Sequence, residues 1–241
     1  MTGTILAAPA RKTRARKAQP RQTRRPQWPM PTGLILLSLI PILAGNARMS
    51  EIASGAVETA LNARFLDSPL PVVIHVVAVT IFSLLGAFQF VPSLRRSRNR
   101  WHRWAGRILV PAGVATSLSG MWMAVFYPHP AGDGDILVVF RLAFGIAMLA
   151  SIALAVRAIV RRNFVVHSEW MTRAYAIAVG AGTQALVLIP ESFLFLPADE
   201  LPRAIFMGAA WAINLAVAEL VIRRRAQHSR LSKQYLGAVQ R

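Results

Sequence analysis

The stretch PVVIHVVAVTIFSLLGAFQF, residues 71–90, decides the fold class of this chain. Twenty residues without a charged side chain are long enough to cross a hydrocarbon core about 30 Å thick as an α-helix. A helix of this kind has no polar face to turn toward water, so it does not suit the surface of a soluble domain. The stretch therefore predicts a transmembrane helix, over residues 71–93.

Similar apolar stretches recur along the chain between short polar connections. Of the 241 residues, 54% are hydrophobic and 16% charged, and the mean hydropathy is +0.43, which is too apolar for a soluble domain. We predict an all-α integral membrane bundle of about six transmembrane helices, embedded in a lipid bilayer. The expected spans are 32–48, 71–93, 106–127, 137–158, 171–195 and 203–222.

The 28 Lys and Arg residues, against 10 Asp and Glu, indicate the topology. Lys and Arg are retained on the cytoplasmic side of short loops. Most of them lie near the two termini and in the connections after the second and fourth spans, so we predict that both termini are cytoplasmic. The predicted parts are a disordered basic tail (1–30), the transmembrane bundle (31–225) and a basic cytoplasmic tail (226–241). Nucleic acid is not expected as a partner, because no aromatic interleaving or known fold accompanies the charge.

Two interpretations of the first span stay open. Pro41 interrupts a short apolar run, and the small residues at 45–47 resemble a cleavage site, so the segment is either a retained helix or a signal peptide. We favour the retained helix, because a basic leader of about thirty residues is long for a signal peptide. The Arg-rich leader also resembles an organellar transit peptide, but the localisation we predict is a bacterial plasma (inner) membrane. After this span, near-helical spacing of apolar residues predicts a short amphipathic helix on the outer surface, with Ile52, Ala56, Ala60 and Phe65 on its apolar face.

Polar side chains at membrane depth are the candidate functional groups, because they cost several kcal/mol unless they are paired. His75 and Gln89 share one stripe of the second span, His75 near its outer end and Gln89 near its inner end. Gly86, on the same stripe, leaves room for a neighbouring backbone or a flat ligand. His102 and His167 stand at the cytoplasmic starts of the third and fifth spans, beside Trp and Arg. Trp and Arg are also ordinary interfacial anchors, so a purely structural role for these histidines stays open.

The chemistry that fits these histidines best is a b-type haem. A single three-histidine zinc site is disfavoured, because His75 is expected at the opposite face from His102 and His167. A haem takes axial imidazoles from facing helices, and Arg side chains for its propionates. We therefore predict His102 and His167 as iron ligands of a haem b at the inner side, while an outer haem at His75 lacks an identified second ligand. The candidate propionate partners are Arg103, Arg107 and Arg173. The chain has no cysteine, which excludes thiolate sites and disulfides.

Other polar residues have structural interpretations. Glu219 and Arg223 are spaced for an i,i+4 ion pair at the cytoplasmic end of the sixth span. Arg141 and Glu191 predict an outer ion pair between the fourth and fifth spans. Gln184 and Asn214 are expected to form interhelical hydrogen bonds.

The motifs around the histidines resemble a known family. They are His75 followed by LGAFQF at 85–90, HRWAGR at 102–107, and HSEWMTRAYA at 167–176. Together they resemble a bacterial group of predicted multi-pass membrane proteins, the domain of unknown function 2306, over about residues 33–220. The resemblance implies an integral membrane domain of this size and implies that the His, Gln and Arg positions quoted belong to the pattern of the group. It implies no particular reaction.

Three functions stay open. The first is a membrane haem protein that passes electrons to or from a redox partner or quinone. The second is a transporter for a small solute or proton, with a path lined by His75, Gln89, Gln184 and Glu191. The third is a non-catalytic scaffold or assembly protein, whose polar residues only hold the helices together. Common catalytic motifs such as G-x-S-x-G and H-E-x-x-H are absent, and whether the protein is an enzyme stays open.

Overall fold

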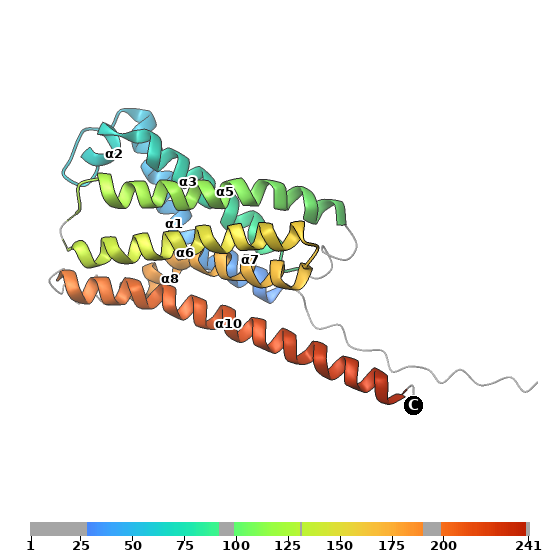
Figure 1. Cartoon of the computed structure of the whole chain (residues 1–241). Coiled ribbons are helices and arrows are strands. Elements are labelled where there is room, and N and C mark those ends of the chain that lie inside the picture. The colour runs from blue at the N-terminus through green and yellow to red at the C-terminus, as the bar shows by residue number, and fades with distance from the viewer. Residues whose placement is uncertain (1–27, 92–98, 131, 190–198, 240–241) are drawn as a thin grey trace, which may run out of the picture.

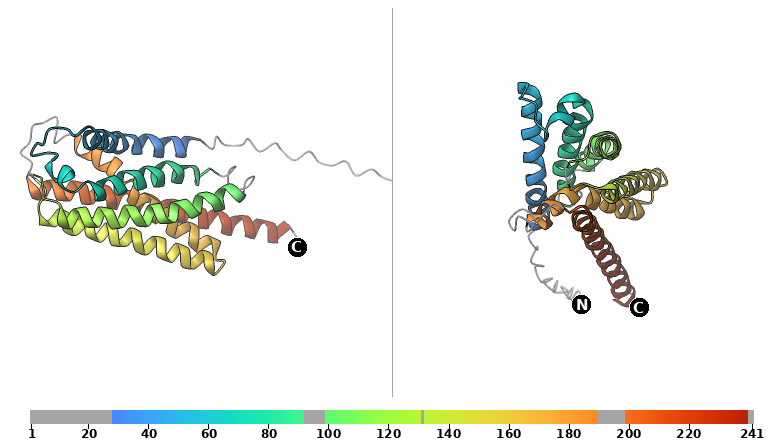
Figure 2. Two further views of the ribbon diagram at one scale, coloured as in Figure 1. Left: turned by 90° about the horizontal axis from the view of Figure 1, so that it is seen from above. Right: turned by 90° about the vertical axis from the view of Figure 1, so that its left-hand side faces the viewer.

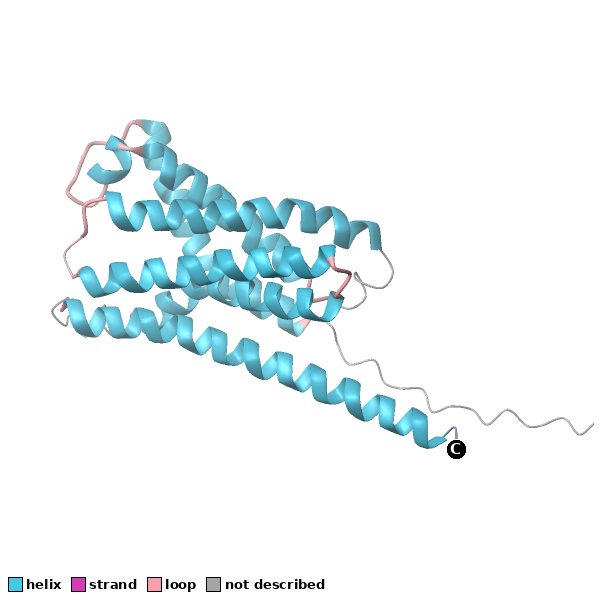
Figure 3. Ribbon diagram, viewed as in Figure 1, coloured by secondary structure: helices cyan, strands magenta, loops and turns pink. Residues whose placement is uncertain are grey.

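The computed structural model describes residues 28–91, 99–130, 132–189 and 199–239. Within these ranges every regular element is an α-helix and there is no strand, so the all-α prediction is confirmed there. Long helices lie alongside one another in a bundle, as Figures 1 and 3 show. Most of the predicted basic tail, residues 1–27, lies outside the described residues.

Eight helices are described, and five of them are long and apolar enough to cross a membrane. The five are α1 (Pro29–Ser54), α3 (Pro69–Phe88), α5 (Asn99–Phe126), α6 (Asp135–Val160) and α10 (Glu200–Val239). They correspond to the spans expected at 32–48, 71–93, 106–127, 137–158 and 203–222. The helix α10 continues through residues 226–239 and extends well beyond its neighbours (Figure 1).

The span expected at 171–195 differs from a single helix. The chain forms α7 (Phe164–Ala178) and α8 (Gly180–Val187), with Val179 between them, and residues 190–195 lie outside the described part. Two side chains of α10 lie at this break. The Trp211 ring occupies the space that a side chain at Gly180 would need. Asn214 donates to the Ala176 carbonyl of α7 (3.1 Å) and accepts from the Thr183 hydroxyl of α8 (2.9 Å), so it joins both halves.

The segment after α1 is a loop, so the amphipathic helix expected there is wrong. Gly55 ends α1 in the left-handed region (φ 62°), a conformation that favours glycine. The Asn62 side chain then accepts from the Thr59 amide (2.6 Å) and donates to the Val57 carbonyl (3.0 Å). These bonds stabilise a compact loop, and only α2 (Ala63–Asp67) is helical before α3 begins. Pro41 and residues 45–47 lie inside α1.

The main core lies where α3, α5, α6 and α7 meet. Phe82, Leu109, Ile152 and Tyr175 are buried there, and the Tyr175 hydroxyl donates to the Ser83 carbonyl (2.8 Å). The Tyr175 ring fills the space above Gly86. The small residue therefore admits an aromatic side chain of α7, where the sequence suggested a backbone or a flat ligand. Figure 2 shows α1 and α10 on different sides of the bundle around this core.

Candidate functional site

Two of the three membrane histidines line the same cavity. His102, in the first turn of α5, and His167, in the first turn of α7, face a cavity of about 530 Å³ that is also bounded by α3 and α6. We call it the paired-histidine cavity. The other residues predicted for the site that line it are Gln89, Arg103 and Arg107. Gln89 follows the last residue of α3, His102, Arg103 and Arg107 lie on α5, and His167 lies on α7, so the bundle brings residues of three helices together.

The two histidines are oriented in the same way. Nδ1 of His102 contacts Oε1 of Gln89, and Nδ1 of His167 lies 3.0 Å from the carbonyl oxygen of Ala155. The Ala155 carbonyl only accepts, so the His167 ring carries its proton on Nδ1, and the Gln89 oxygen atom favours the same tautomer for His102. A histidine that binds a metal through Nε2 usually donates its other N–H to such a protein acceptor. The Gln89 amide is buried, and its Nε2 has no partner among the described residues.

The rest of the cavity is apolar inside and cationic at its rim. Its walls include large apolar side chains from four helices, and no acidic residue is among its described lining. Arg103 and Arg107 are exposed. Arg225 of α10, which the sequence did not single out, also reaches the cavity and lies 5.9 Å from the centre of the Phe90 ring. Such a cavity suits a ligand with a flat apolar body and negative groups at one edge. The apolar walls are formed by Phe82, Leu109, Val110, Val156, Ile159 and Met171.

Arg173 does not line this cavity. Its guanidinium pairs with Glu219 of α10, with N–O distances of 2.5 and 3.2 Å, and lies over the Trp170 ring. Glu219 was expected to pair with Arg223, four residues on in the same helix, but its ion pair is with Arg173 instead. A contact between α7 and α10 that is 46 residues apart in sequence has replaced the local one.

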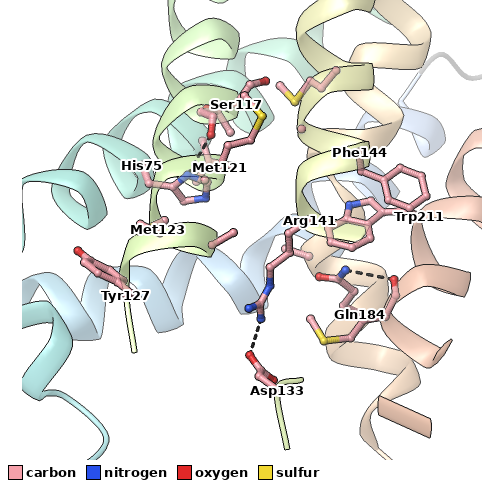
Figure 4. Close-up of a pocket in the computed structure, with 18 of the residues that line it drawn as sticks. His75, Ser117, Met121, Met123, Tyr127, Asp133, Arg141, Phe144, Gln184 and Trp211 are labelled. Carbon is pink, nitrogen blue, oxygen red and sulfur yellow. Dashed lines mark hydrogen bonds and ion pairs between the residues drawn. The ribbon is translucent and has the colours of Figure 1, made fainter. Parts of the chain in front are cut away.

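His75 lines a second cavity, which lies toward the other end of α5 (Figure 4). We call this cavity, of about 340 Å³, the His75 cavity. Nδ1 of His75 lies 3.1 Å from the Thr116 carbonyl and 3.0 Å from the Ser119 hydroxyl. Because His75 lines a different cavity from His102 and His167, it cannot share a metal ion with them. Within the described ranges, no three His, Asp or Glu side chains gather closely enough to hold a metal ion.

A buried carboxylate holds the rim of the His75 cavity together. Asp133, whose side chain is 3% exposed, pairs with Arg141 of α6 (2.6 Å) and with Arg203 of α10 (2.9 Å). Burial alone would raise the pKa of Asp133. The two guanidinium groups lower this pKa by more than burial raises it, so the pKa of Asp133 is below the ordinary value of an aspartate. Arg141 was expected to pair with Glu191, which lies outside the described residues. The sequence signal for Asp133 was only an acidic residue between two glycines in a loop.

The polar residues Gln184 and Asn214 both make interhelical hydrogen bonds. Gln184 of α8 donates to the Met207 carbonyl of α10 (3.2 Å) and lines the His75 cavity. The path proposed for a transporter is thus divided, because His75 and Gln184 line one cavity, Gln89 lines the other, and Glu191 is not described.

Comparison with known proteins agrees with the resemblance seen in the motifs. A family model with the description "Predicted membrane protein (DUF2306)" matches residues 72–222, from the first turn of α3 into α10, and this range contains all three membrane histidines. The motifs predict the family over about residues 33–220, whereas the match begins at residue 72 and leaves α1 outside. No curated protein and no solved structure gives a match. The matched range is more than half of the chain, and the chain belongs to this family of predicted membrane proteins.

Proposed function

We propose that this membrane protein holds a haem b in the paired-histidine cavity and carries electrons across or along the membrane. One observation supports this most strongly. His102 and His167 come from different helices, line one cavity, and each bind a protein acceptor through Nδ1. Because the two ring nitrogens point to different sides, Nε2 of each ring is turned away from that acceptor, and Nε2 is the usual ligand of haem iron.

The remaining lining suits the same group. The apolar walls would hold a macrocycle, and Arg103, Arg107 and Arg225 would supply cations for its propionates. Arg225, in place of Arg173, is the third candidate propionate partner in the cavity lining. Gly106 also lines the cavity, and open space lies beside this glycine, since no atom lies within 4 Å of the position that its Cβ would take. When bound, the iron supplies one-electron transfer. The protein orients the imidazoles, excludes water with apolar walls and balances the propionate charge.

The same proposal places the protein in a bacterial plasma (inner) membrane with both termini in the cytoplasm. It is supported by the positive-inside pattern. It is also supported by the start of α1 and the C-terminal end of α10, which lie toward the same end of the bundle (Figure 1). In this arrangement, α7 and α8 together make a sixth crossing. The paired-histidine cavity then opens toward the cytoplasm, where the rim arginines would meet a redox partner, and a quinone is a candidate acceptor within the bilayer.

The test is the haem content of the full-length protein, purified in detergent from a haem-replete host. The expected result is about one haem per chain, with a Soret band and a reduced α-band. His102→Gln and His167→Gln should each lose most of the haem, because axial ligation fails. His228→Gln is the matched control, since His228 is exposed on the extension of α10. Size-exclusion profiles and helix content establish that each variant is folded. A haem-free wild type, or folded His102→Gln and His167→Gln variants with unchanged spectra, would contradict the proposal.

A second candidate is transport of a small solute or proton, and one observation favours it. The α7–α8 break lies beside the His75 cavity, and Gln184 of α8 lines that cavity together with His75. Interrupted helices are where many transporters bind their substrates. Proton flux into proteoliposomes would test it, with His75→Ala beside wild type. A flux that falls in His75→Ala supports transport, whereas equal leak in both argues against it.

A further inference from the structure

We infer that the His75 cavity is a binding site for a small carboxylic acid with an apolar body. This inference concerns the opposite end of the bundle from the haem proposal and does not depend on it. Three features of the cavity support it, namely polar groups without a hydrogen-bond partner among the described residues, a cation with no described carboxylate at ion-pair distance, and apolar walls.

Two buried polar atoms in the cavity lining have no hydrogen-bond partner among the described residues. They are the hydroxyl of Ser117, a residue that is 4% exposed, and Nε of Arg64. Buried polar groups are normally hydrogen-bonded, because an unsatisfied one costs about 1–3 kcal/mol. Figure 4 shows Ser117 and His75 close together, with Arg141 and Asp133 farther along the cavity. A ligand with oxygen atoms would satisfy groups that the described part of the protein leaves unpaired.

The charges at the rim indicate that this ligand is an anion. Asp133 is the one acidic residue in the described lining, and it already pairs with Arg141 and Arg203. Arg64 donates to the Pro128 carbonyl (3.1 Å), but no described carboxylate lies within ion-pair distance of it. Burial lowers the pKa of Arg64, and the negative charge of Asp133 offsets this only in part. A guanidinium without a described carboxylate at ion-pair distance suits one negative charge, and its planar fork matches a carboxylate.

The volume and the walls limit the rest of the ligand. About 340 Å³ is near the lower end of small-molecule sites, which suits a compact acid and is too small for a phospholipid. Met121, Phe144 and Trp211 provide an apolar wall (Figure 4). The carboxylate then meets Arg64, the apolar body lies against this wall, and the Ser117 hydroxyl and His75 ring are available to a further oxygen atom.

The experiment measures binding of octanoate and benzoate to the full-length protein in detergent by isothermal titration calorimetry. Octanol and benzyl alcohol are the neutral probes, and they report partition into micelles. We expect each carboxylate to bind with a defined stoichiometry and each alcohol to bind on the order of tenfold more weakly, because a charged hydrogen bond is lost. Absence of binding by both carboxylates, or equal binding by the alcohols, would overturn the inference.

Variants locate the site. Arg64→Gln should weaken carboxylate binding on the order of tenfold or more, and Arg64→Lys should weaken it less because the charge is retained. Ser117→Ala gives a second test if Arg64→Gln fails to fold, and it should weaken binding several-fold. Arg48→Gln is the matched control, since Arg48 pairs with Glu51 and does not line the cavity. Unchanged affinity in both Arg64→Gln and Ser117→Ala would overturn the inference, whereas His102→Gln should leave octanoate binding intact whatever its haem content.

Discussion

The two cavities use the same residue types in different electrostatic settings. In both, a histidine is held through Nδ1 by a protein oxygen atom. The paired-histidine cavity has three arginines and no described acidic residue in its lining, whereas the His75 cavity has Asp133, which neutralises arginines of two helices. An arginine at a cavity is therefore not by itself the mark of a ligand site. Arg141 and Arg203, which share a buried carboxylate, link α6 and α10. The exposed Arg103 and Arg107 have no acidic residue in the described lining of their cavity and are accessible to a ligand.

The first prediction removes the charge compensation at the His75 cavity. Asp133→Asn leaves Arg141 and Arg203 without their shared buried partner, so we expect a loss of about 3–5 kcal/mol in stability. Thermal or denaturant unfolding in detergent measures it. Asp135→Asn is the matched control, because Asp135 is exposed in the first turn of α6 and has no described ion pair. Equal stability of the two variants would contradict the role given to Asp133.

The second prediction titrates the same carboxylate. The pKa of Asp133 is lowered in the folded state. The carboxylate therefore contributes fully to stability above the ordinary pKa of an aspartate, about 4. This contribution is lost as the pH falls through the lowered, folded-state pKa. The unfolding midpoint of wild type should therefore drop more steeply below about pH 4 than that of Asp133→Asn. Parallel pH profiles for the two proteins would show that Asp133 does not titrate in this way.

The third prediction perturbs a wall of the paired-histidine cavity. A methyl group at Gly86 would lie within 2.5 Å of the Tyr175 ring, so Gly86→Ala should cost about 1–3 kcal/mol by overpacking. Tyr175 also lines the cavity, so haem content should fall as well. Gly33→Ala in α1 is the control, because open space surrounds Gly33. A Gly86→Ala protein with the stability and haem content of the control would show that Tyr175 moves freely.

The smallest expected effect is at the break between α7 and α8. Asn214→Ala removes hydrogen bonds to Ala176 and Thr183, and interhelical hydrogen bonds of this kind contribute about 0.6 kcal/mol and at most about 1.7. Hydrogen exchange should rise around the break. Asn46→Ala serves for comparison, since Asn46 is exposed and bonds only within α1. If exchange rises equally in both variants, Asn214 does not hold the break.

Much of this arrangement could be predicted from the sequence, because it depends on hydropathy and on the spacing within single helices. The apolar stretch 71–90 predicts α3, and the basic connections place His102 and His167 at the same end of the bundle. The break between α7 and α8 and the contacts made there by α10 could not be predicted. The break at Val179 lies in an uncharged segment without proline, and the side chains that contact it, Trp211 and Asn214, come from another helix.

Ion pairing was the least predictable part of the site. An i,i+4 rule favours Glu219 with Arg223, but the helix packing brings Arg173 closer. The same packing takes Arg173 away from the cavity and brings Arg225 to its rim. Local spacing determines which residues share a helix face, whereas the partner of a long charged side chain depends on which helices become neighbours.

The most direct test of the central claim is the ligation state of the iron, measured by low-temperature electron paramagnetic resonance of the oxidised, haem-containing protein. If His102 and His167 both bind one iron, the wild type should be low-spin. The fraction of haem that His102→Ala or His167→Ala retains should be high-spin and should return to low-spin on addition of free imidazole. A low-spin signal that persists in the folded double variant, without added imidazole, would contradict the claim that these two side chains bind one iron.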